Sequence, residues 1–212
     1  QYWRDLGQRI DMLENAAIVR EDIEKSLEKC RQELLKIGRT LTQRRMKGAR
    51  ELAKLIEKEL GELSIKNGKF KVVFLEEKKL GIPVEKAEFY ISTNVGEKEK
   101  PLKEITSSGE ISRIMLSLKK IFSDVDRIPI LIFDEIDSNI GGETAFTVGK
   151  KLNQIKKNHQ LIIITHMPQI ARFADCHISV RKKEFKGRTK VLASVLEGGE
   201  RVKEIARMMG GE

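Results

Sequence analysis

Two adjacent carboxylates, Asp134 and Glu135, follow a run of four apolar residues, Ile130–Phe133. The apolar run predicts a buried strand, and α/β sheets bind ligands at the carboxyl ends of such strands. In phosphoryl transfer a metal ion gathers charge on the phosphates while a second group orients the attacking water. Asp134 has the chemistry to hold Mg²⁺, directly or through water, and Glu135 to act as the base. The alternative is a strand that ends at the surface with solvated acids.

A histidine, His166, follows a second apolar run at residues 161–165. This run also predicts a buried strand, so His166 and the acid pair each stand directly after a strand. A lone histidine after a strand is commonly a structural residue. The position of His166 relative to the acid-pair strand favours a functional role for this histidine.

A turn of small polar residues, Thr106 to Glu110, leads straight into a predicted helix. Unpaired backbone N–H groups at a helix start attract anions, and Ser107 adds a hydroxyl donor. The same residues match a capping box, with Ser107 as N-cap and Glu110 three positions later. Both interpretations can hold at once.

The elements that must position these residues alternate between strands and helices. Apolar alternation predicts strands at 70–74 and 87–91, and continuous apolar runs predict buried strands at 129–133 and 161–165. Residues 178–180 and 191–195 could pair as a hairpin around residues 186–188. Helical periodicity predicts helices at 111–122, 143–155 and 201–209, and a short helix from Pro168. The expected fold class is α/β, with a mostly parallel sheet flanked by helices.

Residues 1 to about 62 contain no proline and predict one long helix. Its apolar positions step by three and four along a heptad seam, which Arg20 alone interrupts: Leu13, Ala16, Ile23, Leu27, Cys30, Leu34, Ile37 and Leu41. We expect a coiled-coil arm helix at residues 1–45 and a globular lobe at 46–212. The alternative is an amphipathic helix lying on its own domain.

Charge and cysteine usage narrow the class of protein. Lys and Arg number 41 against 32 Asp and Glu, a formal charge of +9, which suits an anionic partner but also describes an ordinary solvated basic surface. Cys30 and Cys176 stand far apart and the three histidines do not cluster, so neither a disulfide framework nor a zinc site is expected. No apolar run is long enough to cross a bilayer, so we expect a cytoplasmic protein without a membrane partner.

The order of the motifs is similar to that in the second lobe of ATP-binding-cassette ATPases. A coiled coil directly before that lobe resembles the SMC-type members, and among them the RecN family of DNA repair ATPases. The stretches that carry this likeness are 94–97, 100–102, 109–116, 133–137, 165–171 and 201–211. The resemblance is strong over residues 45–212 and looser over the arm.

The resemblance implies a fold and a set of roles. The fold would be the carboxy-terminal lobe of a P-loop ATPase head of SMC type. Glu135 and His166 would be catalytic, with His166 as the switch histidine that contacts the γ-phosphate. Asp134 would hold Mg²⁺, and Asp137 would be the D-loop aspartate that faces the partner subunit.

The turn before the helix at 111–122 would be the family's signature motif. Ser107, Ser108, Gly109 and Glu110 would then contact the ATP held by a facing head. The family usually has Leu-Ser-Gly-Gly-Glu here, whereas this chain carries Thr106 and Ser108 at the first and third places. A side chain at Ser108 stands where glycine allows close backbone approach to phosphate.

The motif G-x-x-x-x-G-K-[ST], which cradles phosphates, does not occur in the chain. The resemblance implies that it lies on an amino-terminal lobe of the same protein, so ATP and Mg²⁺ would need that lobe. The chain would be the returning half of a longer protein and would not hydrolyse ATP alone. Further expected partners are a second copy of the head and DNA, held mainly through its phosphates.

The implied function is recombinational repair of DNA double-strand breaks through ATP-driven head dimerisation, in the cytoplasm at the nucleoid. One alternative is the head of another SMC-type protein, such as a cohesin or condensin relative. The run Met167-Pro168-Gln169 after His166 favours RecN. A second alternative is a non-enzymatic coiled-coil dimerisation module whose lobe binds a partner protein.

Overall fold

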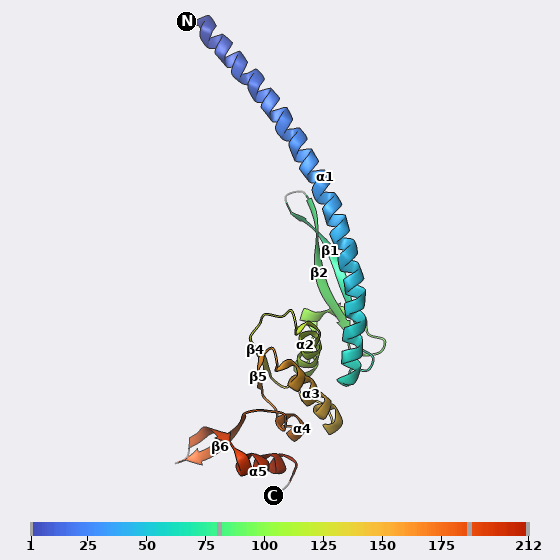
Figure 1. Cartoon of the computed structure of the whole chain (residues 1–212), viewed down its shortest axis with the longest axis vertical. Coiled ribbons are helices and arrows are strands. Elements are labelled where there is room, and N and C mark those ends of the chain that lie inside the picture. Colours follow the sequence, from blue (N-terminus) through green and yellow to red (C-terminus); the bar gives the residue numbers. More distant parts are fainter. Residues whose placement is uncertain (1, 80–81, 186–187, 211–212) are drawn as a thin grey trace. The chain divides into compact units, whose positions relative to one another are not determined.

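A computed structural model describes residues 2–79, 82–185 and 188–210 of the chain. By contacts between α-carbons the chain divides into two compact units, Gln1–Arg50 with Val72–Glu88, and Glu51–Lys71 with Phe89–Glu212. The elements, labelled in Figure 1, are α1 (Tyr2–Glu62), β1 (Lys69–Lys79), β2 (Ile82–Ser92), β3 (Lys100–Pro101), a short 3-10 turn (Leu102–Glu104), α2 (Ser108–Phe122), β4 (Ile130–Phe133), α3 (Gly142–Ile155), β5 (Gln160–Ile163), α4 (Pro168–Ala171), β6 (His177–Phe185), β7 (Arg188–Leu196) and α5 (Gly198–Met208). Along this described part, no helix is long and apolar enough to cross a membrane.

The long helix expected at the start of the chain is confirmed as α1, of 61 residues. It ends where Ser64 takes a left-handed backbone conformation with φ of 63°. The carbonyl of Leu60 then accepts hydrogen bonds from the N–H groups of Leu63 and Ile65, both at 3.0 Å. These bonds satisfy a carbonyl that the helix itself leaves unpaired.

Within the first unit the heptad seam of α1 faces solvent. The exposed fractions of its larger apolar residues lie between 45% and 67%: Ile23, Leu27, Leu34, Ile37 and Leu41. The side chain of Leu13 lies outside the described residues. The strand β2 is tied to α1 inside this unit, since the Thr42 hydroxyl donates to Glu85.

The strands β1 and β2 extend well beyond the predicted ranges 70–74 and 87–91. The added length of β1 ends in the charged residues Glu76–Lys79, so the apolar alternation stops while the strand continues, and β2 begins before its predicted range, at Ile82. An ion pair across the strands, Lys86 Nζ to Glu77 Oε1 at 3.7 Å, supports this extension. The sheet has the order β1-β2-β3, with Tyr90 of β2 opposite Pro101 of the antiparallel β3.

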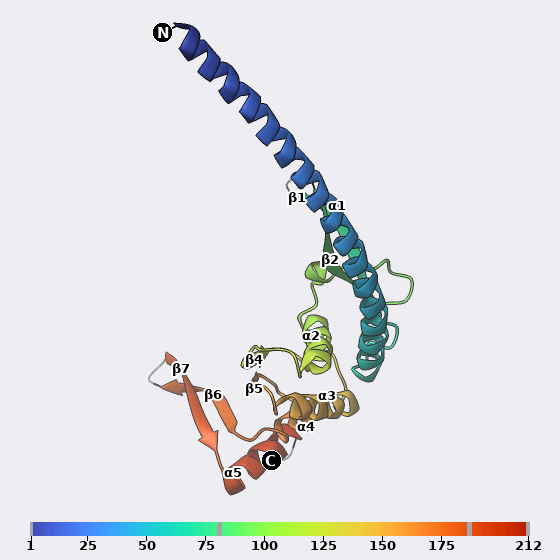
Figure 2. The ribbon, with the colours of Figure 1, turned by 45° about the horizontal axis from the view of Figure 1, so that its top comes forward.

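The strands β4 and β5 pair in parallel, with Phe133 opposite Ile163. Leu131 and Phe133 are buried in a core shared with α2 and α3. In Figures 1 and 2, α2 and α3 both lie on the same side of this pair. The prediction of two fully buried strands is wrong for the other face, where exposed fractions range from 46% to 65% at Ile130, Ile132, Ile162 and Ile164. That face is exposed because none of the described elements covers it.

The hairpin predicted near residues 178–195 is confirmed and is longer than expected. Its strands β6 and β7 are antiparallel from the pair His177–Leu196 to the pair Phe185–Arg188. Lys186 and Gly187, at the predicted turn, lie outside the described residues. The parallel arrangement is therefore seen in β4–β5, while β6–β7 and β2–β3 are antiparallel.

A buried charge cluster joins the last turns of α1 to α2 and α3. The ammonium group of Lys151, 3% exposed, contacts Glu59 and lies 2.6 Å from Glu62 Oε2. Lys120 of α2 lies 2.7 Å from the same Glu59. Burial alone lowers the pKa of Lys151, but its hydrogen bonds to Glu59 and Glu62 outweigh burial and raise that pKa.

Substitution of Lys151 by Met should lower the free energy of unfolding by about 3 kcal/mol, because it leaves Glu59 partly buried without this partner. The control is Lys157→Met, at an exposed lysine of the same region that has no described ion pair. Urea denaturation of both variants measures the difference. Equal losses would contradict a structural role for the cluster.

The carboxylate of Glu204 on α5 accepts hydrogen bonds from Arg207 and Arg181, which outweigh its burial and lower its pKa from 4.5 to about 2. A lowered folded-state pKa means that this stabilisation is present above the unfolded value and is lost as pH falls through the folded one. The difference in unfolding free energy between the natural protein and Glu204→Gln should therefore be largest above pH 4.5. It should disappear as the pH falls from 4.5 to about 2. Thermal unfolding across that range measures the difference, and a difference independent of pH would contradict the assignment.

Candidate functional site

A buried carboxylate, Asp137, organises the candidate site. It is 3% exposed and lies in the loop after β4. Its Oδ2 accepts hydrogen bonds from the Thr165 hydroxyl at 2.5 Å and from the backbone N–H of His166 at 2.9 Å. A buried carboxylate needs such donors, so the loop after β4 and the segment after β5 are held together.

The ring of His166 stands beside this carboxylate at the surface. Its Nδ1 lies 3.1 Å from Asp137 Oδ2, while 77% of the His166 side chain remains exposed. The predicted neighbourhood of His166 and the acid-strand loop is thus present in the fold. The resemblance implies that Asp137 faces a partner subunit; within its own chain its Oδ2 accepts hydrogen bonds from Thr165 and His166.

The acid pair leaves β4 with an unusual backbone. Glu135 has φ of 53°, a left-handed conformation that residues with a side chain seldom adopt. Such conformations concentrate at functional sites, where the surroundings hold them. The Ser108 hydroxyl donates to Glu135 Oε2 and so joins the signature turn to the acid pair.

The carboxylate of Asp134 is exposed and makes no hydrogen bond or ion pair with any described residue. Its backbone carbonyl accepts from the Ser112 hydroxyl at 2.9 Å, which positions the residue. No group of three or more metal-binding side chains gathers among the described residues. A free carboxylate of this kind fits Mg²⁺, which is commonly held by one or two carboxylates together with substrate phosphates.

Ser107 is half-buried and caps α2. Its hydroxyl accepts from the N–H of Glu110 at 3.4 Å, so the capping interpretation of this turn is confirmed. Thr106 and Ser108 are exposed beside it, and Gly109 is buried. The cap leaves the anion-binding interpretation open, because the remaining N–H groups of the first turn have no partner within the helix.

The start of α2 packs tightly on the loop that follows the acid pair. A β-carbon added at Gly109 would lie 2.7 Å from the Cβ of Ser138, closer than real side chains approach. The guanidinium of Arg113 reaches the same loop and donates to the carbonyls of Ser138 at 2.8 Å and Ile136 at 3.4 Å. The signature turn and the acid-pair loop therefore form one packed block.

Sequence reasoning missed two residues of this site. Arg113 is 6% exposed, and its burial lowers the pKa of the guanidinium. Its charge within an otherwise apolar helical face was the available signal. Thr165 donates to Asp137 and accepts from the N–H of Met167 at 3.0 Å. No sequence pattern at the end of a strand predicts this role for a threonine.

Known proteins resemble this chain over its whole length. It is 37% identical to the DNA repair protein RecN of Halalkalibacterium halodurans over 216 residues, which cover 100% of the chain and 38% of that protein. It is 35% identical to the DNA repair protein RecN of Treponema pallidum over 219 residues, again 100% of the chain and 38% of the relative. The chain thus spans about two fifths of the length of these curated relatives. No protein-family model matches the chain.

A solved structure supports the fold. The Smc head domain with a coiled coil and joint from Pyrococcus yayanosii superposes with a TM-score of 0.58 at 19% identity, over 90% of this chain and 35% of that one. This likeness confirms the expected fold, an α/β lobe like that of an Smc head domain with a long helix before it.

Replacing Gly109 by Ala should destabilise the protein by about 1–3 kcal/mol, because the new methyl group forces α2 away from Ser138. The control is Gly199→Ala, since Gly199 is also the second residue of a helix and a β-carbon there meets nothing within 4 Å. That change should be neutral or slightly stabilising. Urea denaturation measures both, and equal effects would refute the tight contact.

Proposed function

The chain belongs to the RecN family of DNA repair proteins and corresponds to their carboxy-terminal part, and on that premise we propose that it forms the second lobe of an ATP-hydrolysing head. Because the chain spans 38% of these relatives, the activity is that of the complete protein. The coiled-coil arm would occupy residues 1–45 and the lobe residues 46–212.

One observation carries this proposal. The parallel register of β4 and β5, together with the hydrogen bonds to Asp137, supports a single site for Asp134, Glu135 and His166 at one edge of the strand pair. Bound ATP and Mg²⁺ would supply the phosphoryl group and its charge neutralisation. Asp134 would hold the metal, Glu135 would orient and deprotonate the attacking water, and His166 would donate a hydrogen bond to the γ-phosphate.

We assign the exposed face of β4–β5 to the amino-terminal lobe of the same protein. The apolar side chains on this face are those that a neighbouring layer of an α/β domain would bury: Ile130, Ile132, Ile162 and Ile164. That lobe would carry the phosphate-cradling loop, which the 212 residues lack. The chain alone is therefore not expected to hydrolyse ATP.

The signature turn would act on a second copy of the head. Ser107, Ser108, Gly109 and Glu110 would contact the ATP that the facing head holds, with Ser107 at its γ-phosphate, and two heads would enclose two ATP molecules. Ser108 stands at a place usually taken by glycine, and its hydrogen bond to Glu135 supports a further role. It would keep the base in place within its own head.

The complete protein would act on DNA at double-strand breaks, in the cytoplasm at the nucleoid. The formal charge of +9 supports contact with phosphates, and such binding weakens with salt. ATP binding would join two heads, and hydrolysis would release them. The names of the relatives support DNA repair as the setting.

A second candidate is a non-enzymatic dimerisation module. The exposed seam on α1, from Ile23 to Leu41, favours it because such a seam needs a partner helix. This function requires no base at Glu135, so the two candidates differ in what they expect of that residue.

Glu135→Gln in the complete protein should reduce ATP turnover by about 100-fold or more, because an amide cannot accept the proton of the attacking water. ATP-bound dimers should accumulate, which gel filtration with ATP can detect. Glu143→Gln, at an exposed acid in the first turn of α3, is the control and should leave turnover unchanged. Normal turnover in Glu135→Gln would remove this residue as the base, and a complete protein that turns over no ATP before substitution would favour the dimerisation module.

A further inference from the structure

A basic groove of about 620 Å³ lies in the second unit, and neither the acid pair nor His166 lines it. Three segments form its walls: the last turns of α1, the loop from α1 to β1, and the loop after β2. The charged residues of the lining are four lysines and two acids: Lys54, Lys58, Lys66, Lys69, Glu57 and Glu97. We call this feature the basic groove.

The floor of the basic groove is fixed by the chain itself. The N–H of Gly68 donates to the Ile65 carbonyl at 3.0 Å. A β-carbon at Gly68 would lie 3.0 Å from side-chain atoms of both Ile65 and Leu60, so the loop packs closely against the end of α1. The loop that carries Lys66 and Lys69 therefore has a defined conformation before any ligand binds.

The two acids of the groove are already engaged. Glu57 accepts from the N–H of Phe70 at 3.2 Å and lies 3.8 Å from Lys69 Nζ. Glu97 accepts from the Asn94 side chain at 3.0 Å. In contrast, the other three lysines of the groove are exposed and have no hydrogen bond or ion pair with a described residue: Lys54, Lys58 and Lys66. The charge of Lys58 helps to lower the pKa of Glu62, after the larger effect of the hydrogen bond from Lys151, whereas Lys54 and Lys66 have no acid partner among the described residues.

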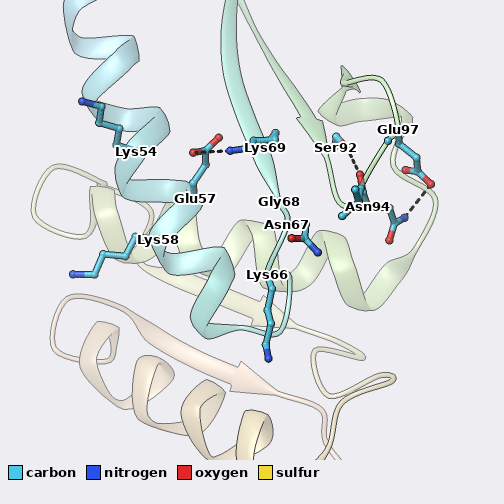
Figure 3. A pocket seen from close by; sticks show the side chains of 12 residues that line it. Lys54, Glu57, Lys58, Lys66, Asn67, Gly68, Lys69, Ser92, Asn94 and Glu97 are labelled. Atoms are coloured by element: carbon cyan, nitrogen blue, oxygen red, sulfur yellow. Dashed lines mark hydrogen bonds and ion pairs between the residues drawn. The ribbon is translucent and has the colours of Figure 1, made fainter.

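The directions of these lysines indicate the shape of the ligand. Figure 3 shows Lys54 and Lys58 extending from α1 and Lys66 extending from the loop in another direction, while Lys69 faces Glu57. Their ammonium groups are spread out and do not converge on one point. A compact anion such as a single phosphate cannot contact all three, whereas an extended polyanion can.

The lining also distinguishes between polyanions. It contains no aromatic side chain on which a base could stack. Single-strand binding proteins typically combine positive charge with aromatic stacking platforms, whereas duplexes are held mainly through their phosphates. The groove therefore fits the backbone of a duplex.

We propose that the basic groove binds the phosphate backbone of duplex DNA through Lys54, Lys58 and Lys66. This inference rests on the proposed function for its choice of DNA, but it uses none of the residues assigned to ATP. It places DNA contact at the base of the arm helix, in the same unit as the acid pair.

The test is the affinity of the complete protein for a short DNA duplex, measured by fluorescence anisotropy without ATP over a range of salt concentrations. The variant Lys54→Glu, Lys58→Glu, Lys66→Glu should bind about tenfold more weakly or worse, and its salt slope should fall by about 2.7, or about 0.9 for each phosphate that is no longer neutralised. A neutral variant, Lys54→Gln, Lys58→Gln, Lys66→Gln, should show the same direction of change. Thermal unfolding of both verifies that they fold.

The matched control replaces three exposed lysines elsewhere in the unit by glutamate: Lys157, Lys183 and Lys203. It changes the net charge by the same amount as the groove variant. The control should bind DNA more tightly than the groove variant does. Its affinity should depend on salt concentration almost as steeply as that of the natural protein. Equal weakening would reduce the effect to net charge and overturn the proposal, as would undiminished binding by the groove variant. Displacement of the duplex by an equimolar amount of inorganic tripolyphosphate would also overturn it, since the site would then prefer a short free anion.

Basal ATP turnover is measured on the same variants and should be unchanged. Loss of DNA binding with normal turnover supports the groove whatever the outcome for Glu135→Gln. Normal DNA binding in the groove variant, with turnover lost in Glu135→Gln, would refute the groove and leave the ATPase proposal standing.

Discussion

The arrangement of the site depends on one buried charge. Asp137 cannot be buried as a carboxylate unless donors reach it, and the donors come from the segment after β5, at Thr165 and His166. The loop after β4 is thereby fastened to the end of the neighbouring strand. Together with the parallel register of β4 and β5, these bonds keep the acid pair and the histidine at the same edge of the strand pair.

The same loop is held from its other side by α2. Gly109 allows the helix start to approach Ser138, and the Arg113 guanidinium bonds to the loop carbonyls. Ser108 adds a hydrogen bond to Glu135. The signature turn and the acid pair are thus parts of one packed block. Movement of one would therefore displace the other.

Ion pairs hold the last turns of α1 against this block. Lys151 and Lys120 bind Glu59, which places the last turns of α1 against α2 and α3. The basic groove is built on those same turns of α1. If DNA occupies the groove, its binding energy acts on a helix that is ion-paired to the helix bearing the signature turn.

The sequence by itself determined the local elements and the order of the motifs. Apolar periodicity is a local property, so α1, β4, β5 and the hairpin β6–β7 were predictable, as was the acid pair at a strand end. The likeness to RecN followed from the same motifs. The length of β1 was underestimated because charged residues continue the strand after the apolar alternation stops, and β2 begins at Ile82, before the alternation that predicted it. Only the tertiary structure decided which groups meet. The hydrogen bonds to Asp137, from Ser108 to Glu135 and from Arg113 to Ser138 all join residues more than twenty positions apart.

The sequence also could not predict the exposed face of β4–β5, because an apolar strand has the same pattern whether or not a second layer covers it. Contacts between distant segments depend on how elements pack, and no local pattern of residues encodes that packing.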